Sequence, residues 1–156
     1  MRVREVKKKD IEERFSEMSD YLRIDYLSSC LKNNLDFDTR KFVLVKLAGI
    51  FETKGMFLDA GKSMKSAAEI NTSVQNKIND FVKAAELFIR AGDYEKSDVV
   101  MRKGIQLAEE RKGEIENNVK EFYKTQGRSC VEKNKRKQAI GVYEKLKLFS
   151  QLEINR

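Results

Sequence analysis

Apolar and small residues recur along this chain with one fixed internal spacing, in three consecutive stretches. The stretches cover residues 44–67, 81–104 and 123–146, and they begin 37 and 42 residues apart. Within each stretch the marked positions follow one another at intervals of 3, 1, 3, 4, 2, 3, 4 and 3 residues. A period in this range is typical of stacked two-helix units, none of which can bury its apolar face alone. The pattern therefore predicts an all-α chain of repeated helical hairpins.

The same spacing predicts the bounds of the helices. We expect pairs over residues 38–54 and 57–70, 74–91 and 94–111, and 114–132 and 136–150. The turns within the pairs fall at Gly55, Gly92 and Asn134, residue types that accept the left-handed backbone of a helix C-terminus. Gly113 is expected to mark the join before the last pair.

The N-terminal part follows the pattern less well. We expect residues 1–9 to be a frayed, basic arm and Asp10 with Glu13 to form a capping box that starts the first helix. Residues 10–33 are expected to form a degenerate first hairpin, although one continuous helix over the same residues is an alternative. Asp36 or Asp38 can cap the following helix. Residues 151–156 are expected to be a short tail.

Small and large residues alternate in a way that suits close helix packing. Ala48, Ala85 and Gly127 occupy the same place in the three stretches, and Phe51 and Phe88 follow in the first two. Small residues let two helices approach, and large ones fill the gaps beside them. We therefore expect these positions to be buried in one continuous core.

Composition agrees with a single helical domain. The chain has 156 residues, of which 40% are hydrophobic and 37% charged, and it lacks proline. Its formal net charge of +7 is uneven, because residues 1–9 contribute +4, residues 119–156 contribute +6 and the middle is acidic. The basic ends can attract an anionic partner or only keep the protein in solution. Cys30 and Cys130 are expected to be reduced core thiols, which indicates a cytoplasmic protein without a membrane span.

The residues that usually carry catalysis are missing or misplaced. Because the chain has no histidine, the most common general base and most zinc sites are excluded. Gly61-Lys62-Ser63 resembles the end of a phosphate-binding loop, but Met56 stands where the loop needs its first glycine. We expect no enzyme activity, no cofactor and no metal, with Gly61 instead allowing close helix packing.

The repeated pattern resembles tetratricopeptide repeats. The segment Ala91-Gly92-Asp93-Tyr94-Glu95 is similar to that family's inter-helix turn, and Ala60 and Ala139 match its second-helix alanine. The unit lengths exceed the family's 34 residues, and its terminal proline is absent, so the hairpins of soluble NSF attachment proteins are also similar. The resemblance covers about residues 40–150. It implies a right-handed α–α superhelix of three clear hairpins and one degenerate one.

In such superhelices the first helix of each unit lines a concave groove, so the resemblance implies a protein-interaction scaffold or adaptor. The groove positions carried over to this chain are Val45, Glu52, Val82, Glu86, Ile89, Arg90, Lys124 and Arg128. A fitting partner is an amphipathic helix or extended peptide with apolar anchors and an acidic end. Lys124 and Arg128 lie one helical turn apart and could hold a carboxylate. A clamp for chaperone C-termini is disfavoured, because Val45 and Gly49 replace the lysine and asparagine it needs.

A basic cluster supports an alternative function. It consists of Lys133, Lys135, Arg136 and Lys137 at the last inter-helix turn. Together with the basic N-terminal arm, the cluster could bind phosphates of nucleic acid or of another anionic surface, or it could be only a solvated turn. A third alternative is a plain helical bundle that serves as a subunit of a larger complex, and the sequence leaves open whether the chain works as a monomer.

Overall fold

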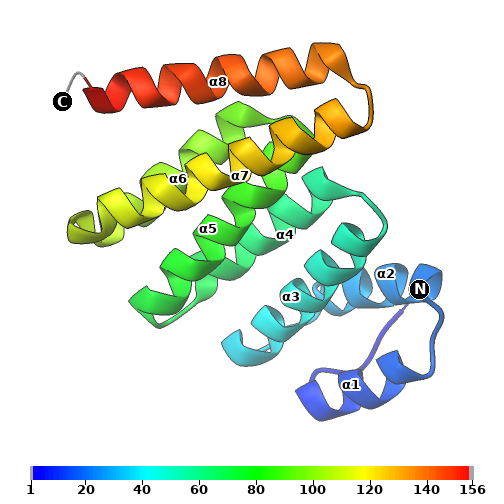
Figure 1. The fold of residues 1–156 in the computed structure, drawn as a ribbon. Coiled ribbons are helices and arrows are strands. Elements are labelled where there is room, and N and C mark those ends of the chain that lie inside the picture. Colours follow the sequence, from blue (N-terminus) through cyan, green and yellow to red (C-terminus); the bar gives the residue numbers. More distant parts are fainter. Residues whose placement is uncertain (1, 155–156) are drawn as a thin grey trace.

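A computed structural model describes residues 2–154, with side chains described for residues 2–150. These residues form eight α-helices and one short 3₁₀-helix, and they contain no strand. The helices are α1 (Lys8–Ser16), α2 (Asp20–Cys30), α3 (Phe37–Thr53), α4 (Phe57–Ile70), α5 (Val74–Ala91), α6 (Tyr94–Leu107), η1 (Glu109–Arg111), α7 (Lys112–Glu132) and α8 (Arg136–Ile154). The all-α prediction is confirmed, and each helix packs against its neighbours in chain order (Figure 1).

Most helices begin and end close to the expected residues, and the bounds of α4 and α5 are the predicted ones. One exception is α6, which ends at Leu107 because Ala108 adopts an extended backbone. A 3₁₀ turn over Glu109–Arg111 then leads into α7, so the join lies before Gly113 rather than at it. Another exception is α8, which continues to Ile154 and so includes residues 151–154 that were expected to belong to a tail. Of the two candidate caps for α3, Asp36 accepts the bond from the backbone N–H of Thr39 at 2.7 Å.

The three turns within the hairpin pairs have the same backbone geometry. Gly55, Gly92 and Asn134 lie at φ values of 75°, 79° and 60°, and Asn134 is the single non-glycine at positive φ among the described residues. In each turn the following N–H donates to the carbonyl five residues back, namely Met56 to Phe51 at 2.8 Å, Asp93 to Phe88 at 2.9 Å and Lys135 to Cys130 at 2.8 Å. These bonds close a helix C-terminus in the same way each time, which confirms the alignment of the three stretches.

The hairpins stack in two layers, with α3, α5 and α7 on one side and α4 and α6 on the other (Figure 1). Ala48, Ala85 and Gly127 are all buried between helices, as expected. Gly61 is also a close-packing position, because a Cβ there would lie 2.7 Å from the ring of Phe88. Across the second layer, Lys103 of α6 forms an ion pair with Glu69 of α4 at 3.2 Å.

The core consists of two clusters rather than the single continuous one that we expected. One cluster lies among α1, α2, α3 and the segment before α1, and the other extends from α3 to α8. Phe51 packs against both clusters. The N-terminal helices therefore add a separate small core, which agrees with the poor match of residues 10–33 to the repeat.

The frayed N-terminal arm that we expected is wrong for residues 2–9, because this segment packs against the rest of the chain. Val3 is buried, and the side-chain amide of Asn33 donates to the carbonyls of Val3 at 2.8 Å and Glu5 at 3.2 Å. Glu5 accepts from Arg14 at 2.7 Å. Two helices, α1 and α2, replace the alternative of one continuous helix. The predicted capping box is wrong, because α1 already begins at Lys8 and its N-cap, Lys7, makes no side-chain capping bond.

Candidate protein-interaction surfaces

The face formed by α3, α5 and α7, here called the layer face, carries most of the predicted groove residues. Val45, Arg90, Lys124 and Arg128 are exposed, whereas Glu52, Val82 and Glu86 are partly buried. The placement of Ile89 on this face is wrong, because its side chain is completely buried in the core. Helix α5 packs against α4, α6 and α7, so its buried arc is wide and includes Leu87, Phe88 and Ile89 together.

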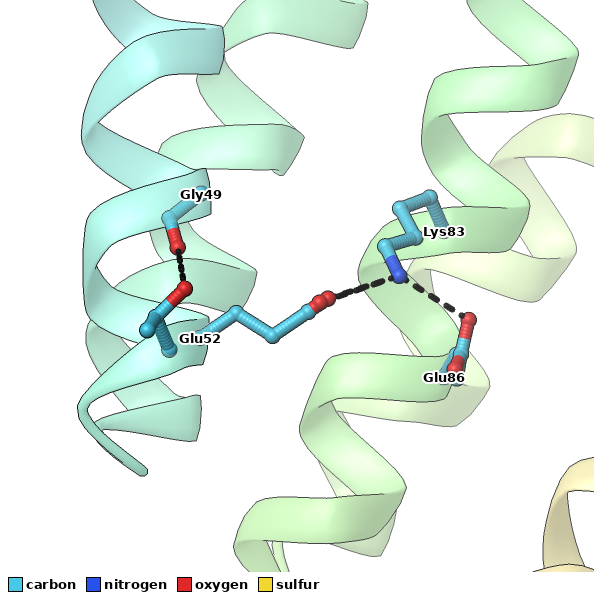
Figure 2. A network of polar contacts seen from close by, with 5 residues as sticks. Gly49, Glu52, Lys83 and Glu86 are labelled. Carbon is cyan, nitrogen blue, oxygen red and sulfur yellow. Dashed lines mark hydrogen bonds and ion pairs between the residues drawn. The ribbon is translucent and has the colours of Figure 1, made fainter.

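A network of charged side chains crosses the layer face between α3 and α5 (Figure 2). The Lys83 ammonium donates to the Glu52 carboxylate at 2.9 and 3.3 Å and to the Glu86 carboxylate at 3.3 Å. Beside it on α3, the Thr53 hydroxyl donates to the carbonyl of Gly49 at 2.9 Å. Two of the predicted groove residues, Glu52 and Glu86, are therefore held by one lysine that offsets the repulsion between their carboxylates.

Lys83 is a residue that the sequence analysis missed. Partial burial lowers the pKa of Lys83, but its hydrogen bonds and charge contacts with Glu52 and Glu86 outweigh burial and raise the pKa above its ordinary value. The available signal was charge alone, since Lys83 and Glu86 are three residues apart on one helix and Glu52 is the acid at the end of the preceding first helix. This site is negative overall, with two carboxylates around one ammonium.

The other cations of the layer face contact neighbouring groups. The Arg90 guanidinium lies 4.1 Å from the centre of the Phe57 ring, where it covers the start of α4. Lys124 forms an ion pair with Glu121 at 3.1 Å, and the Arg128 side chain donates to the carbonyl of Lys124 at 3.4 Å. Lys124 and Arg128 are thus near each other, as expected, but Lys124 already has an exposed carboxylate partner. Exposed pairs of this kind are weak.

The four residues of the basic cluster are all exposed around the turn between α7 and α8, namely Lys133, Lys135, Arg136 and Lys137. No carboxylate of the described residues forms an ion pair with any of its four side chains. The cluster therefore presents four positive charges to solvent.

An apolar recess of about 670 Å³, here called the end recess, adjoins the basic cluster. It is lined by Val131, Asn134, Arg136, Ala139, Ile140, Tyr143, Glu144 and Lys147. Val131 and Ile140 are 60% and 58% exposed, and Tyr143 is 41% exposed. The sequence analysis did not predict this recess, because the recess depends on how α7 and α8 pack against each other.

Comparison with known proteins and a search for membrane-spanning helices and metal sites add few constraints on function. No family model, curated protein or solved structure matches this chain. Among residues 2–154, no helix combines the length and the apolar composition that crossing a bilayer requires. Within the same residues, no group of three or more acidic, cysteine or histidine side chains is arranged to hold a metal ion.

Proposed function

We propose that this chain is a protein-interaction scaffold of the tetratricopeptide-like kind, which binds a peptide or helix of a partner protein along the layer face. The observation that carries the proposal is the repeated turn geometry at Gly55, Gly92 and Asn134, because it places the first helix of three successive hairpins in one layer. Stacks of this kind present extended surfaces that suit peptide recognition. The proposal includes the right-handed superhelical path of that family and assigns no catalytic role.

The exposed side chains of the layer face indicate which partner would fit. Val45 on α3 and the partly exposed Val82 on α5 offer apolar contacts, while Lys124 and Arg128 on α7 offer positive charge. An amphipathic segment with apolar anchors and an acidic end complements that order. Cys30 and Cys130 are buried and unbridged, which supports placing this role in the cytoplasm.

The proposal can be tested by titrating the isotope-labelled chain with a synthetic peptide that carries leucines at i, i+3 and i+7 and ends in aspartates. The expected result is chemical-shift changes along α3, α5 and α7, with binding weakened about tenfold by Val45→Glu, as for loss of one apolar anchor. Val99→Glu is the matched control, because Val99 is a similarly exposed valine on α6, in the other layer. Equal losses from both variants, or shifts confined to other helices, would contradict the proposal.

A nucleic-acid or anionic-surface binder is the second candidate, favoured by the basic cluster, whose four side chains pair with no carboxylate of residues 2–150. Binding through phosphates weakens steeply with salt, whereas capture of an apolar-anchored peptide does not. Measuring RNA binding at two salt concentrations, for the native chain and for a variant with Lys133, Lys135, Arg136 and Lys137 changed to glutamine, distinguishes the two functions.

A further inference from the structure

The last hairpin differs from the two before it at its outer surface. Met64 and Met101 lie at the same repeat position and are buried at 7% and 8% exposure. Tyr143, their counterpart on α8, is 41% exposed. The same apolar position is thus covered in the first two hairpins and open in the last, where no described segment lies over it.

The open surface has a defined shape rather than being a loose patch. Because Gly127 has no side chain, the Tyr143 ring lies directly on α7, and a Cβ at Gly127 would meet its Cζ at 2.7 Å. Val131 and Ile140 flank the ring and complete the apolar floor of the end recess. Its volume of about 670 Å³ is in the range of natural binding pockets and gives room for a few apolar side chains.

The rim of the end recess is positively charged. Arg136 and Lys147 line it, and Glu144 is the single acid of the lining. Lys133 and Lys135 lie on the adjoining turn, and Lys137 lies in the first turn of α8. No carboxylate of residues 2–150 pairs with these five cations. An apolar floor with an unneutralised basic rim matches a helix that has an apolar ridge and acidic flanks.

We propose that the end recess is a second docking site, which binds an amphipathic, acid-flanked helix of a partner protein through Val131, Ile140 and Tyr143. A second copy of this chain is a poorer occupant, because its other end, residues 1–9, is also strongly basic, and like charges would face each other. Nucleic acid is poorer too, because its phosphates would leave the apolar floor uncovered. The site combines Val131 near the end of α7 with Ile140 and Tyr143 of α8, and it uses neither Val45 nor Val82 of the layer face.

The test uses a fluorescent helical peptide with leucines at i, i+4 and i+7 and glutamates on both flanks, measured by fluorescence anisotropy. The matched probe has lysines in place of the glutamates. We expect the acidic probe to bind and the basic one to bind at least tenfold more weakly. Ile140→Glu should weaken binding of the acidic probe at least tenfold, as expected when a charge replaces an apolar anchor.

Two further variants keep the test decisive. Val99→Glu is a control for a surface valine replaced by a charge, and it should leave binding unchanged with helix content intact by circular dichroism. Val45→Glu should also leave the acidic probe bound at the end recess, which separates this site from the layer face. Replacing Lys133, Lys135 and Lys137 by glutamine should weaken binding several-fold and reduce its dependence on salt.

Three outcomes would overturn the proposal. In the first, Ile140→Glu binds the acidic probe as well as the native chain does. In the second, RNA or vesicles of anionic lipid bind at this end, unaffected by Ile140→Glu, while the acidic probe does not bind. In the third, sedimentation shows a dimer that Ile140→Glu dissociates, in which case the end recess is an interface between copies.

Discussion

The two ends of this helical stack differ in how much of their apolar surface is covered. At the N-terminal end, the segment before α1 folds back and buries Val3, and Asn33 ties the segment down by two hydrogen bonds. At the C-terminal end, Ile140 and Tyr143 remain exposed beside a basic cluster. The difference indicates that one end of the stack is closed by the chain itself, while the other offers a surface that another molecule can cover.

The largest effect expected from this difference concerns two isoleucines near opposite ends. Ile11 is fully buried and Ile140 is 58% exposed. Ile11→Ala should lower the free energy of unfolding by about 2–5 kcal/mol, through lost apolar contact and the cavity left behind. Ile140→Ala should change it by less than about 0.5 kcal/mol. Urea unfolding followed by circular dichroism measures both, and similar losses would contradict the assignment of an open end.

Two glycines that each lie against an aromatic ring sharpen the comparison. A Cβ at Gly61 or Gly127 would lie 2.7 Å from the ring of Phe88 or Tyr143. Phe88 is fully buried and cannot yield, so Gly61→Ala should cost about 1–3 kcal/mol in the free energy of unfolding. Tyr143 can turn toward solvent, and alanine favours the helix, so Gly127→Ala should stay within about 0.5 kcal/mol of the native chain.

The two glycine variants can also be compared by how well they bind the acidic probe. Gly127→Ala displaces Tyr143 and should weaken the acidic probe at the end recess, although the helix content is unchanged. Gly141→Ala on α8 is the control, because a Cβ there meets nothing within 4 Å. If Gly127→Ala destabilised the chain as much as Gly61→Ala, the Tyr143 ring would be held more firmly than its exposure indicates.

Removing the Asn33 hydrogen bonds at the N-terminal end should reduce stability moderately. Asn33→Ala removes the donor to the carbonyls of Val3 and Glu5, and the free energy of unfolding should fall by about 1 kcal/mol. Hydrogen exchange should accelerate in α1 and α2 and stay unchanged in α5. Asn34→Ala, at the exposed neighbouring residue, is the matched control. A loss that extends equally to α5 would mean that Asn33 supports more than this end.

The smallest expected effect comes from the middle of the stack, where Lys83 joins α3 to α5. Lys83→Met should lower the free energy of unfolding by less than about 1 kcal/mol, because the ion pairs are partly exposed. The pKa of Lys83 is raised in the folded chain above its ordinary value of 10.5. The stabilisation is therefore complete below pH 10.5 and is lost as the pH rises above it. Lys54→Met, at the exposed end of α3, is the control for removing a lysine charge.

The repeat pattern predicted the hairpins and their turns because both follow from local chemistry. Glycine or asparagine ends a helix wherever a left-handed residue is needed, and the spacing of apolar residues follows the helix period. The buried position of Ile89 was missed because its surroundings depend on how many helices enclose α5. The folded-back arm was missed for a similar reason, since contact between Val3 and Asn33 joins residues far apart in the chain.

The candidate surfaces were predictable only in part. Helix phase correctly places Val45, Lys124 and Arg128 at the surface, but it cannot show that Lys83 reaches Glu52 on another helix. The end recess depends on Tyr143 lying over Gly127, which is a contact between two helices and not a property of either pattern position. The sequence did contain one signal of the end recess, because glycine and tyrosine in the third stretch replace the alanine and methionine of the first two.

Phe51 packs against both core clusters, so the chain can be regarded as two cooperative folding units that share one side chain. Unfolding of α1 and α2 would expose the smaller cluster while leaving most contacts of the larger one in place. Such partial opening is common where few contacts cross between units. The stack would then detach its first hairpin at a lower free energy than the rest, and denaturant would melt it in an earlier step.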